Sequence, residues 1–326
     1  MKALITGGAG FIGSHLSQLL LEQNYQVVAI DDLSQGSERN ITHLADNPGF
    51  QFVLETILNE SVVDRLVSEC DIIFHLAAVV GVELIIKDPT HTIETNVFGT
   101  STVLRIANRY RRKILLTSTS EVYGKSTSVP FNEESDSVIG ASSHNRWSYA
   151  TSKALDDFLA LAYHHQQRLP VIICRLFNTI GPRQTGRYGM VVPRLVSQAL
   201  RNQPLTVYGD GNQTRCFTDV NDVCNAIYGL SIHSEAPGRV YNIGNTEEVS
   251  ILELANKIIK LTNSKSRISI IPYDKAYQPG FEDMVRRVPD ITRVKDLIGF
   301  SPCFTLEESL VKIIKWMQSS DNIDCF

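Results

Sequence analysis

Short apolar runs alternate with amphipathic stretches along the first half of the chain. Runs rich in Val, Ile, Leu and Phe occupy residues 3–6, 26–31, 51–54, 72–75, 114–117 and 171–176, as expected of strands buried on both faces of a parallel sheet. Patterns with a helical period lie between them, at about 11–23, 60–69, 93–110 and 147–166. This strand–helix alternation predicts an α/β fold with a doubly wound parallel sheet.

The second half of the chain is less regular and is interrupted by Pro and Gly. Helices are predicted near 190–202, 220–233, 250–262 and 305–318. With 326 residues, two domains are expected. We predict a doubly wound domain over 1–176 and a smaller mixed α/β domain over 177–326. The alternative that segments near 212–235 return to the first domain stays open.

The first predicted strand leads into three glycines at the start of a helix. Gly7, Gly10 and Gly13 have the spacing GxxGxxG. Such glycines allow a tight turn, close approach of the backbone to a pyrophosphate, and close packing of helix on strand. The helix N-terminus then offers free N–H groups to the anion. The motif predicts a Rossmann dinucleotide site, in which Phe11 and Ile12 also contact the cofactor.

The second predicted strand ends in a carboxylate. Asp31 can accept hydrogen bonds from the adenosine ribose hydroxyls and would repel a 2′-phosphate. This favours NAD over NADP as the cofactor. Asp32 is the alternative residue for the same role, although a loop carboxylate is its more common interpretation.

A tyrosine and a lysine four residues apart begin the helical pattern at 147–166. This spacing puts Tyr149 and Lys153 on one helix face. A tyrosine that acts as a base at neutral pH needs its pKa lowered by about 3 units, and a neighbouring ammonium favours the phenolate. Thr119 follows the strand at 114–117, where ligand crevices form in parallel sheets, and could bond the same substrate oxygen.

Together these features resemble the extended short-chain dehydrogenase/reductase family of nucleotide-sugar epimerases, dehydratases and decarboxylases. The resemblance runs from Met1 to about Pro302. Further matching pieces are His75-Leu-Ala-Ala78, Asn96 with Gly99-Thr100, Arg175-Leu-Phe-Asn178, Gly181-Pro182-Arg183, Tyr208-Gly-Asp-Gly211, Gln213-Thr-Arg215 and Arg287-Val-Pro-Asp290.

The resemblance implies roles for several of these residues. Ala77 and Ala78 would line the cofactor channel, and Asn96 would support the sheet near it. The residues expected to hold the nucleotide sugar are Asn178, Val192, Arg215 and Arg287. The family often grips adenine with an Asp–hydrophobic pair after the third strand, where this chain has Thr56 and Ile57. His75 is interpreted as a packed histidine at a strand end.

Three adjacent residues bear on the reaction. Thr119-Ser120-Glu121 lacks the Asp with which 4,6-dehydratases protonate a leaving hydroxyl, so that reaction is less favoured. With a downstream Arg-x-Pro-Asp, the motif resembles that of UDP-glucuronate decarboxylases. Glu121 would orient the sugar ring, and Arg287, or its neighbour Arg286, would recognise the carboxylate or protonate C5. A 4-epimerase of UDP-uronates or other nucleotide sugars is the alternative.

A dinucleotide-binding protein without turnover is a further alternative, but it would be expected to lose Tyr149 or Lys153.

Composition and charge bear on the possible partners, metal sites and cellular compartment. The net charge is −4 and the densest basic stretch, 109–113, is interpreted as a solvated helix end, so no nucleic acid partner is expected. Six cysteines without CxxC pairs predict no metal site and a reducing, cytoplasmic compartment. No signal peptide or membrane span is predicted.

Assembly is predicted from the resemblance alone. The helices at 93–110 and 147–166 each keep an apolar stripe. In the family, two such helices pair with their symmetry mates as a four-helix bundle. A homodimer is therefore expected. The resemblance implies a UDP-sugar that carries a uronic acid as the small-molecule partner.

Overall fold

The computed structural model describes residues 1–186, 189–276 and 284–319. Its centre is a parallel sheet of seven strands in the order β11-β6-β5-β4-β1-β2-β3. These strands are β1 (Lys2–Thr6), β2 (Gln26–Asp31), β3 (Phe50–Leu54), β4 (Ile72–His75), β5 (Lys113–Thr119), β6 (Val171–Leu176) and β11 (Arg239–Ile243). The predicted doubly wound parallel sheet is confirmed. Its strand order reverses between β1 and β4, which is where such sheets bind ligands.

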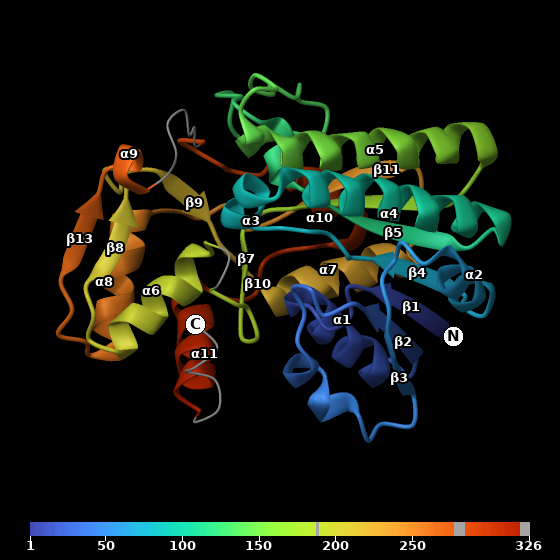
Figure 1. The fold of residues 1–326 in the computed structure, drawn as a ribbon, viewed down its shortest axis with the longest axis horizontal. Coiled ribbons are helices and arrows are strands. Elements are labelled where there is room, and N and C mark those ends of the chain that lie inside the picture. Colours follow the sequence, from blue (N-terminus) through green and yellow to red (C-terminus); the bar gives the residue numbers. More distant parts are fainter. Residues whose placement is uncertain (187–188, 277–283, 320–326) are drawn as a thin grey trace.

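Helices cover both faces of this sheet (Figure 1). On one face lie α1 (Phe11–Glu22), α7 (Val220–Ile232) and α10 (Thr292–Ile298), and on the other α2 (Glu60–Ser68), α4 (Pro89–Arg109) and α5 (Ser148–Gln167). Successive side chains of a strand point to opposite faces, so Ala3 and Ile5 pack towards α1 while Leu4 packs towards α2 and α4. The apolar runs are therefore buried on both sides, as their composition predicted.

Helix α4 begins four residues before its predicted start. Asp88 caps it by accepting a hydrogen bond from the backbone of His91 at 3.0 Å, and Pro89 occupies the first turn. Pro is favoured there because the first N–H groups of a helix have no partner within the helix. Short elements that the periodicity did not predict are α3 (Val82–Lys87), α9 (Tyr273–Ala276), α10, and the 3₁₀ turns η1 (Glu38–Asn40), η2 (Thr42–Leu44), η3 (Ser120–Tyr123) and η4 (Asn145–Trp147).

The second half of the chain builds a separate hydrophobic cluster and also returns to the sheet. The cluster contains α6 (Val191–Leu200), α8 (Ile251–Thr262), α11 (Leu306–Gln318), β8 (Leu205–Tyr208) and β13 (Ile268–Ile271). Two small pairs are β7 (Thr179–Ile180) with β10 (Thr218–Asp219), and β9 (Thr214–Cys216) with β12 (Glu248–Ser250). Helix α7 packs on α1, and β11 pairs with β6. A domain boundary near residue 176 stays a prediction.

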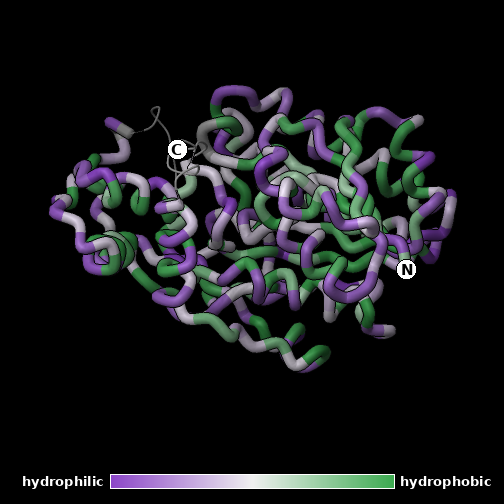
Figure 2. The backbone as a smooth tube through the Cα atoms, turned by 90° about the horizontal axis from the view of Figure 1, so that it is seen from below, coloured by the Kyte–Doolittle hydropathy of each residue, from purple (hydrophilic) through white to green (hydrophobic). Residues whose placement is uncertain are grey.

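The hydropathy of the chain follows this arrangement. Hydrophobic stretches concentrate in the interior and hydrophilic ones around the periphery (Figure 2). Among the described residues, no helix has the length and apolar character that crossing a bilayer requires. Five cysteines are free thiols, four of them buried (Cys70, Cys174, Cys216, Cys224 and the exposed Cys303). Cys325 lies outside the described residues.

Candidate active site

A cavity of about 800 Å³ lies at the carboxyl ends of the parallel strands. It is lined by the turn after β1, by the ends of β2, β4, β5 and β6, and by segments of the second half from Asn178 to Trp316. Its size is within the range of small-molecule sites, and its position is the crevice expected of an open parallel sheet. The cavity therefore brings together most of the residues that the sequence singled out.

The glycine turn after β1 forms one wall of the cavity. Gly7 has a φ of +70°, a conformation that disfavours other residues. A Cβ on Gly13 would overlap the carbonyl oxygen of Gly7, so the helix can approach the turn only with glycine there. Gly10, Phe11 and Ile12 also line the cavity, and α1 begins at Phe11 with its first N–H groups at this wall. This backbone suits a pyrophosphate.

The two candidate carboxylates at the end of β2 both line the cavity but differ in their contacts. Asp31 accepts hydrogen bonds from the backbone N–H of Ala9 at 3.0 Å and of Leu33 at 2.8 Å. Burial raises the pKa of Asp31, and these two bonds oppose the rise. Asp32 accepts from Ser34 at 2.9 Å within its own turn. Asp31 is thus fixed against the glycine turn, as a ribose ligand should be.

The wall after β3 corrects one prediction. Thr56 does not line the cavity, and its hydroxyl accepts a hydrogen bond from Leu58 within its own turn at 3.3 Å. Its neighbours Glu55 and Ile57 line the cavity instead. Glu55 is one residue closer to the strand end, and the resemblance to the family's Asp–hydrophobic pair did not single it out. Ile57 keeps the place predicted for it.

The loop after β4 forms the wall opposite β2. Ala77 and Ala78 line the cavity as predicted. Asn96 itself does not line the cavity, and its expected place beside the cofactor stays a prediction. Its amide oxygen accepts from the N–H of Val79 at 2.8 Å, and its nitrogen donates to Ser152 at 3.3 Å. Asn96 therefore supports the loop from α4, as the resemblance suggested for the sheet.

Tyr149 and Lys153 face the cavity from the first turns of α5. Thr119, at the end of β5, makes a side-chain hydrogen bond with Tyr149 that favours the phenolate. Burial and the nearby charge of Glu121 nevertheless raise the pKa of Tyr149 above its ordinary value. That Lys153 lowers this pKa stays a prediction. The Lys153 ammonium contacts the carboxylate of Asp156 at 2.9 Å, which offsets its charge.

Glu121 lies between two arginines at the same end of the cavity. Its carboxylate contacts Arg287 at 2.7 Å and Arg146 at 2.6 Å, and Arg287 also donates to Asn178 at 3.3 Å. Burial alone would raise the pKa of Glu121, but the two guanidinium groups hold it well below its usual range. Ser120 lines the cavity beside them. Arg146 had no signal in the sequence, because it lies in a loop segment without periodicity.

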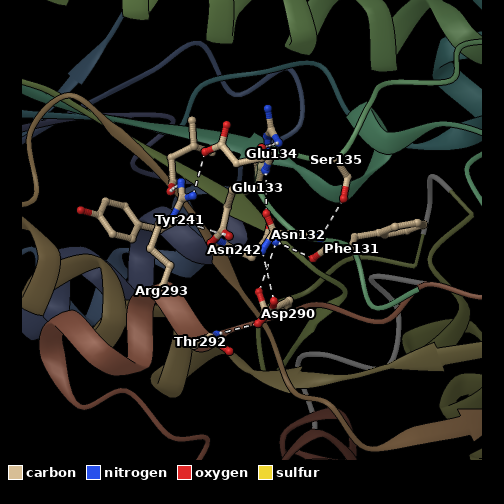
Figure 3. Close-up of polar contacts among 12 residues, drawn as sticks. Phe131, Asn132, Glu133, Glu134, Ser135, Tyr241, Asn242, Asp290, Thr292 and Arg293 are labelled. Atoms are coloured by element: carbon tan, nitrogen blue, oxygen red, sulfur yellow. Dashed lines mark hydrogen bonds and ion pairs between the residues drawn. The ribbon is translucent and has the colours of Figure 1, made fainter. Parts of the chain in front are cut away.

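Arg287 and its neighbour Arg286 lie in different environments. Arg286 forms an exposed pair with Glu248 at 2.5 Å, whereas Arg287 is buried in the cavity. Hydrogen bonds hold the segment that carries them. Phe131 donates to Val288 and accepts from Asp290, each at 2.8 Å, and Asn242 on β11 donates to the carbonyl oxygens of Phe131 and Asp290 (Figure 3). Two distant segments thus place Arg287 in the cavity.

The remaining wall comes from the second half of the chain. Asn178, Val192 and Arg215 line the cavity as predicted, and Arg215 on β9 is buried. The sequence did not single out Met190 or Tyr273, which line the same wall. The described residues contain no group of acidic, histidine or cysteine side chains that could hold a metal ion.

Comparisons with known proteins show the family to which the chain belongs. A family model described as GDP-mannose 4,6 dehydratase matches residues 4–313. A UDP-N-acetyl-alpha-D-glucosaminuronate decarboxylase of Bacillus cytotoxicus is 41% identical over 322 residues, which cover 98% of this chain and 99% of the relative. A UDP-glucuronic acid decarboxylase 1 of Danio rerio is 37% identical over 97% of this chain and 72% of the relative.

Solved structures share the whole fold. A UDP-glucuronic acid 4-epimerase from Bacillus cereus, in complex with UDP-glucuronic acid and NAD, superposes with a TM-score of 0.88 at 32% identity, covering 97% of this chain and 99% of that one. A dTDP-glucose 4,6-dehydratase from Bacillus anthracis, in complex with NAD, gives a TM-score of 0.86 at 30% identity over 99% and 98% of the two chains.

Proposed function

Because the chain belongs to the GDP-mannose 4,6-dehydratase family of extended short-chain dehydrogenase/reductases, we propose that it is an NAD-dependent enzyme that decarboxylates a UDP-linked hexuronic acid. The observation that carries the proposal is the buried contact of Glu121 with Arg287, beside Thr119 and Tyr149. A guanidinium at the reacting end of the cavity suits a substrate that carries a carboxylate. The decarboxylases named above support the same reaction.

NAD is the cofactor that these residues fit. The glycine turn would hold the pyrophosphate, Asp31 the adenosine ribose, and Lys153 the nicotinamide ribose. Bound NAD⁺ would supply the oxidation at C4 of the sugar, and its reduced form would supply the hydride that converts the 4-ketone left after loss of CO₂ into the UDP-pentose. Titration of protein fluorescence with each dinucleotide tests this assignment. Tighter binding of NADP than of NAD would overturn the role given to Asp31.

The side chains of the cavity have distinct tasks in this reaction. Tyr149 takes the proton of the C4 hydroxyl as a general base, and Thr119 hydrogen-bonds the same oxygen. A C4 ketone is β to the C6 carboxylate, so the electrons left by CO₂ delocalise from C5 into an enolate. Tyr149 and Thr119 stabilise that oxyanion. Arg287 binds the carboxylate or protonates C5, and Glu121 orients both the arginine and the ring.

A 4-epimerase of UDP-uronates is the second candidate. It would need the same base and the same recognition of a carboxylate, and the epimerase from Bacillus cereus shares the fold. Elimination of a 6-hydroxyl is less favoured, because Ser120 stands where a dehydratase would need an acid. Retention or loss of the carboxylate distinguishes the two candidates.

The experiment is product analysis with two substrates, UDP-glucuronate and UDP-N-acetylglucosaminuronate. Release of CO₂ and a UDP-pentose, or its N-acetylated counterpart, supports decarboxylation and identifies the sugar. Conversion to the 4-epimer without CO₂ supports the second candidate. A Tyr149→Phe control distinguishes enzymatic turnover from spontaneous loss of CO₂. If the wild-type protein binds NAD but alters neither sugar, the proposal is wrong.

We also propose that the protein is a homodimer formed through α4 and α5. These two helices lie side by side (Figure 1). They expose large apolar side chains, with Phe98 58% and Phe158 73% exposed, together with Ile93 and Leu155. Exposed apolar groups on neighbouring elements mark interaction surfaces, and a twofold axis lets one patch cover its own copy.

Light scattering with a matched control tests the dimer. Phe158→Glu should yield a monomer, because it places a charge in the interface. Ile232→Glu changes an equally apolar exposed residue on α7 and should leave the dimer intact. A wild-type monomer at micromolar concentration would overturn the proposal.

The free thiols of the five described cysteines support a cytoplasmic location for this assembly.

A further inference from the structure

A chain of buried polar contacts leads from Lys153 into the protein and away from the substrate. The Lys153 ammonium contacts Asp156 Oδ2 at 2.9 Å, and Thr100 donates its hydroxyl to the same oxygen at 3.1 Å. His75 Nε2 lies 3.0 Å from the Thr100 hydroxyl, and His75 Nδ1 lies 2.7 Å from the hydroxyl of Thr6. The chain thus connects α5, α4, β4 and β1 through side chains alone.

The donors and acceptors of this chain assign the protons along it. An ionised Asp156 only accepts, so Thr100 must donate to it and its oxygen accepts from His75 Nε2–H. His75 Nδ1 then carries a lone pair, which accepts from the Thr6 hydroxyl. Thr6 in turn accepts from the backbone N–H of Ala77 at 3.2 Å. Burial and the nearby charge of Lys153 lower the pKa of His75 to about 3, in agreement with a neutral ring.

The contact between Lys153 and Asp156 affects the charge of the lysine, because both side chains are buried. Their side chains are only 2% and 1% exposed. A buried ammonium without an anion beside it loses its proton readily, because desolvation disfavours the charged form. Burial raises the pKa of Asp156, while Lys153 and the hydrogen bond from Thr100 lower it. Asp156 therefore favours the charged state of the lysine, and the hydrogen bond from Thr100 favours the ionised state of Asp156.

We infer that Asp156 is a positioning residue that keeps Lys153 protonated and held toward the cavity, and that Thr100 and His75 tie this pair to the loop at Ala77. The inference rests on the proposed function only in taking Lys153 as the partner of Tyr149. The lysine of the pair thus has a built-in counter-ion outside the YxxxK motif. That counter-ion is three residues further along the same helix, where it contacts the lysine from the next turn.

Other charged groups surround this pair and must be distinguished from Asp156 in a test. Asp157 on α5 pairs with Arg175 of β6 at 3.0 Å, and its charge interacts with Lys153 without a hydrogen bond between them. The remaining titratable groups that face the pair or Tyr149 are His75 on β4, Glu121 on η3, and Arg287. Asp157 is the matched control, because it is adjacent, acidic and buried.

The experiment measures the protonation of Lys153 directly. The NAD-free full-length protein is reductively methylated with formaldehyde over a range of pH, since only the neutral amine reacts. Mass spectrometry then quantifies the labelled peptide that contains Lys153. In Asp156→Asn the pH of half-labelling should fall by at least about one unit, because the buried ammonium loses its counter-ion. In Asp157→Asn it should fall by less than half of that amount, because Asp157 interacts with Lys153 only through its charge and already pairs with Arg175.

Thr100→Val removes a hydrogen bond to Asp156 and keeps the carboxylate. It should leave the pH of half-labelling within about half a unit of the wild-type value, because the carboxylate stays beside the lysine. An unshifted Asp156→Asn, or an equal shift in Asp157→Asn, overturns the inference. Should Asp156→Asn lose cooperative thermal unfolding, Asp156→Ser is labelled in its place, and an unshifted pH of half-labelling there overturns the inference. The labelling needs no sugar, so a failure of the proposed function, seen as no turnover by the wild type, is a separate result.

Discussion

Arg286 and Arg287 are adjacent in the chain and lie in opposite environments. The side chain of Arg287 is 8% exposed and contacts Glu121 at 2.7 Å, whereas that of Arg286 is 53% exposed and contacts Glu248. Substituting each in turn by Met removes the same charge and a similar volume. The pair of variants therefore compares a buried cation of the site with a surface cation one residue away.

The buried contact of Arg287 with Glu121 determines how much stability the substitution of Arg287 removes. Removing one partner of a buried ion pair costs about 3–5 kcal/mol, because the other charge is left without compensation. Arg146 still contacts Glu121 at 2.6 Å, so Arg287→Met should cost about 3 kcal/mol, at the lower end of that range. For a chain of 326 residues the unfolding entropy is about 0.7 kcal/mol/K, so this loss lowers the melting temperature by roughly 4–5 °C. Turnover should fall by roughly 100-fold or more, since a preorganised charge at the reacting carbon is lost.

Two assays at pH 7 check the predicted loss of stability and the predicted loss of turnover. Differential scanning calorimetry compares the melting temperatures of the wild type and the two variants, and CO₂ release from the UDP-uronate compares their turnover. Arg286→Met should resemble the wild type in both, because an exposed ion pair is largely screened by solvent. If Arg286→Met loses as much turnover as Arg287→Met, or if Arg287→Met keeps wild-type values, the assignment of Arg287 to the site is refuted.

Three further predictions follow from single contacts. Tyr149→Phe should lower turnover by at least about 10³-fold while NAD still binds, as seen by turnover assays and NAD titration; retained activity would assign the base elsewhere. Gly13→Ala should abolish NAD binding and cost about 1–3 kcal/mol, because its Cβ overlaps the carbonyl oxygen of Gly7; wild-type NAD affinity would contradict this. Burial lowers the pKa of His15 to about 4 and that of His75 to about 3. Both folded values lie below the unfolded value of about 6.5, so the neutral histidines contribute a stability to the fold that is complete above pH 6.5 and is lost as the pH falls. The loss should be about 2 kcal/mol per histidine at pH 5, and equal urea midpoints at pH 7 and pH 5 would exclude it.

Features that depend only on residues close together in the sequence were predictable from it. The bounds of β4 and β6 agree with the apolar runs at 72–75 and 171–176 to the residue. A parallel strand is buried on both faces, so its composition alone distinguishes it from a helix of period 3.6. The glycine turn and the pair Tyr149 and Lys153 were predictable for the same reason. Their geometry is set within one turn or one helix.

The tertiary structure decided what those residues contact. Arg146, Glu121 and Arg287 are far apart in sequence, and only the packing of three segments brings their charges within 3 Å. Glu55 and Ile57 line the cavity and Thr56 does not, which no pattern in the sequence indicated. The raised pKa of Tyr149 likewise comes from burial and Glu121.

The sequence by itself determined the alternation of the first six strands of the sheet with the long helices between them, the glycine turn, and the pair Tyr149 and Lys153, since each is a local property of the chain. The folded molecule alone decided that β11 and α10 return to the sheet, and that Asp156 serves Lys153. Contacts between distant segments depend on sheet register and helix packing. No short window of sequence carries that information, because many partners can satisfy the same hydrophobic pattern.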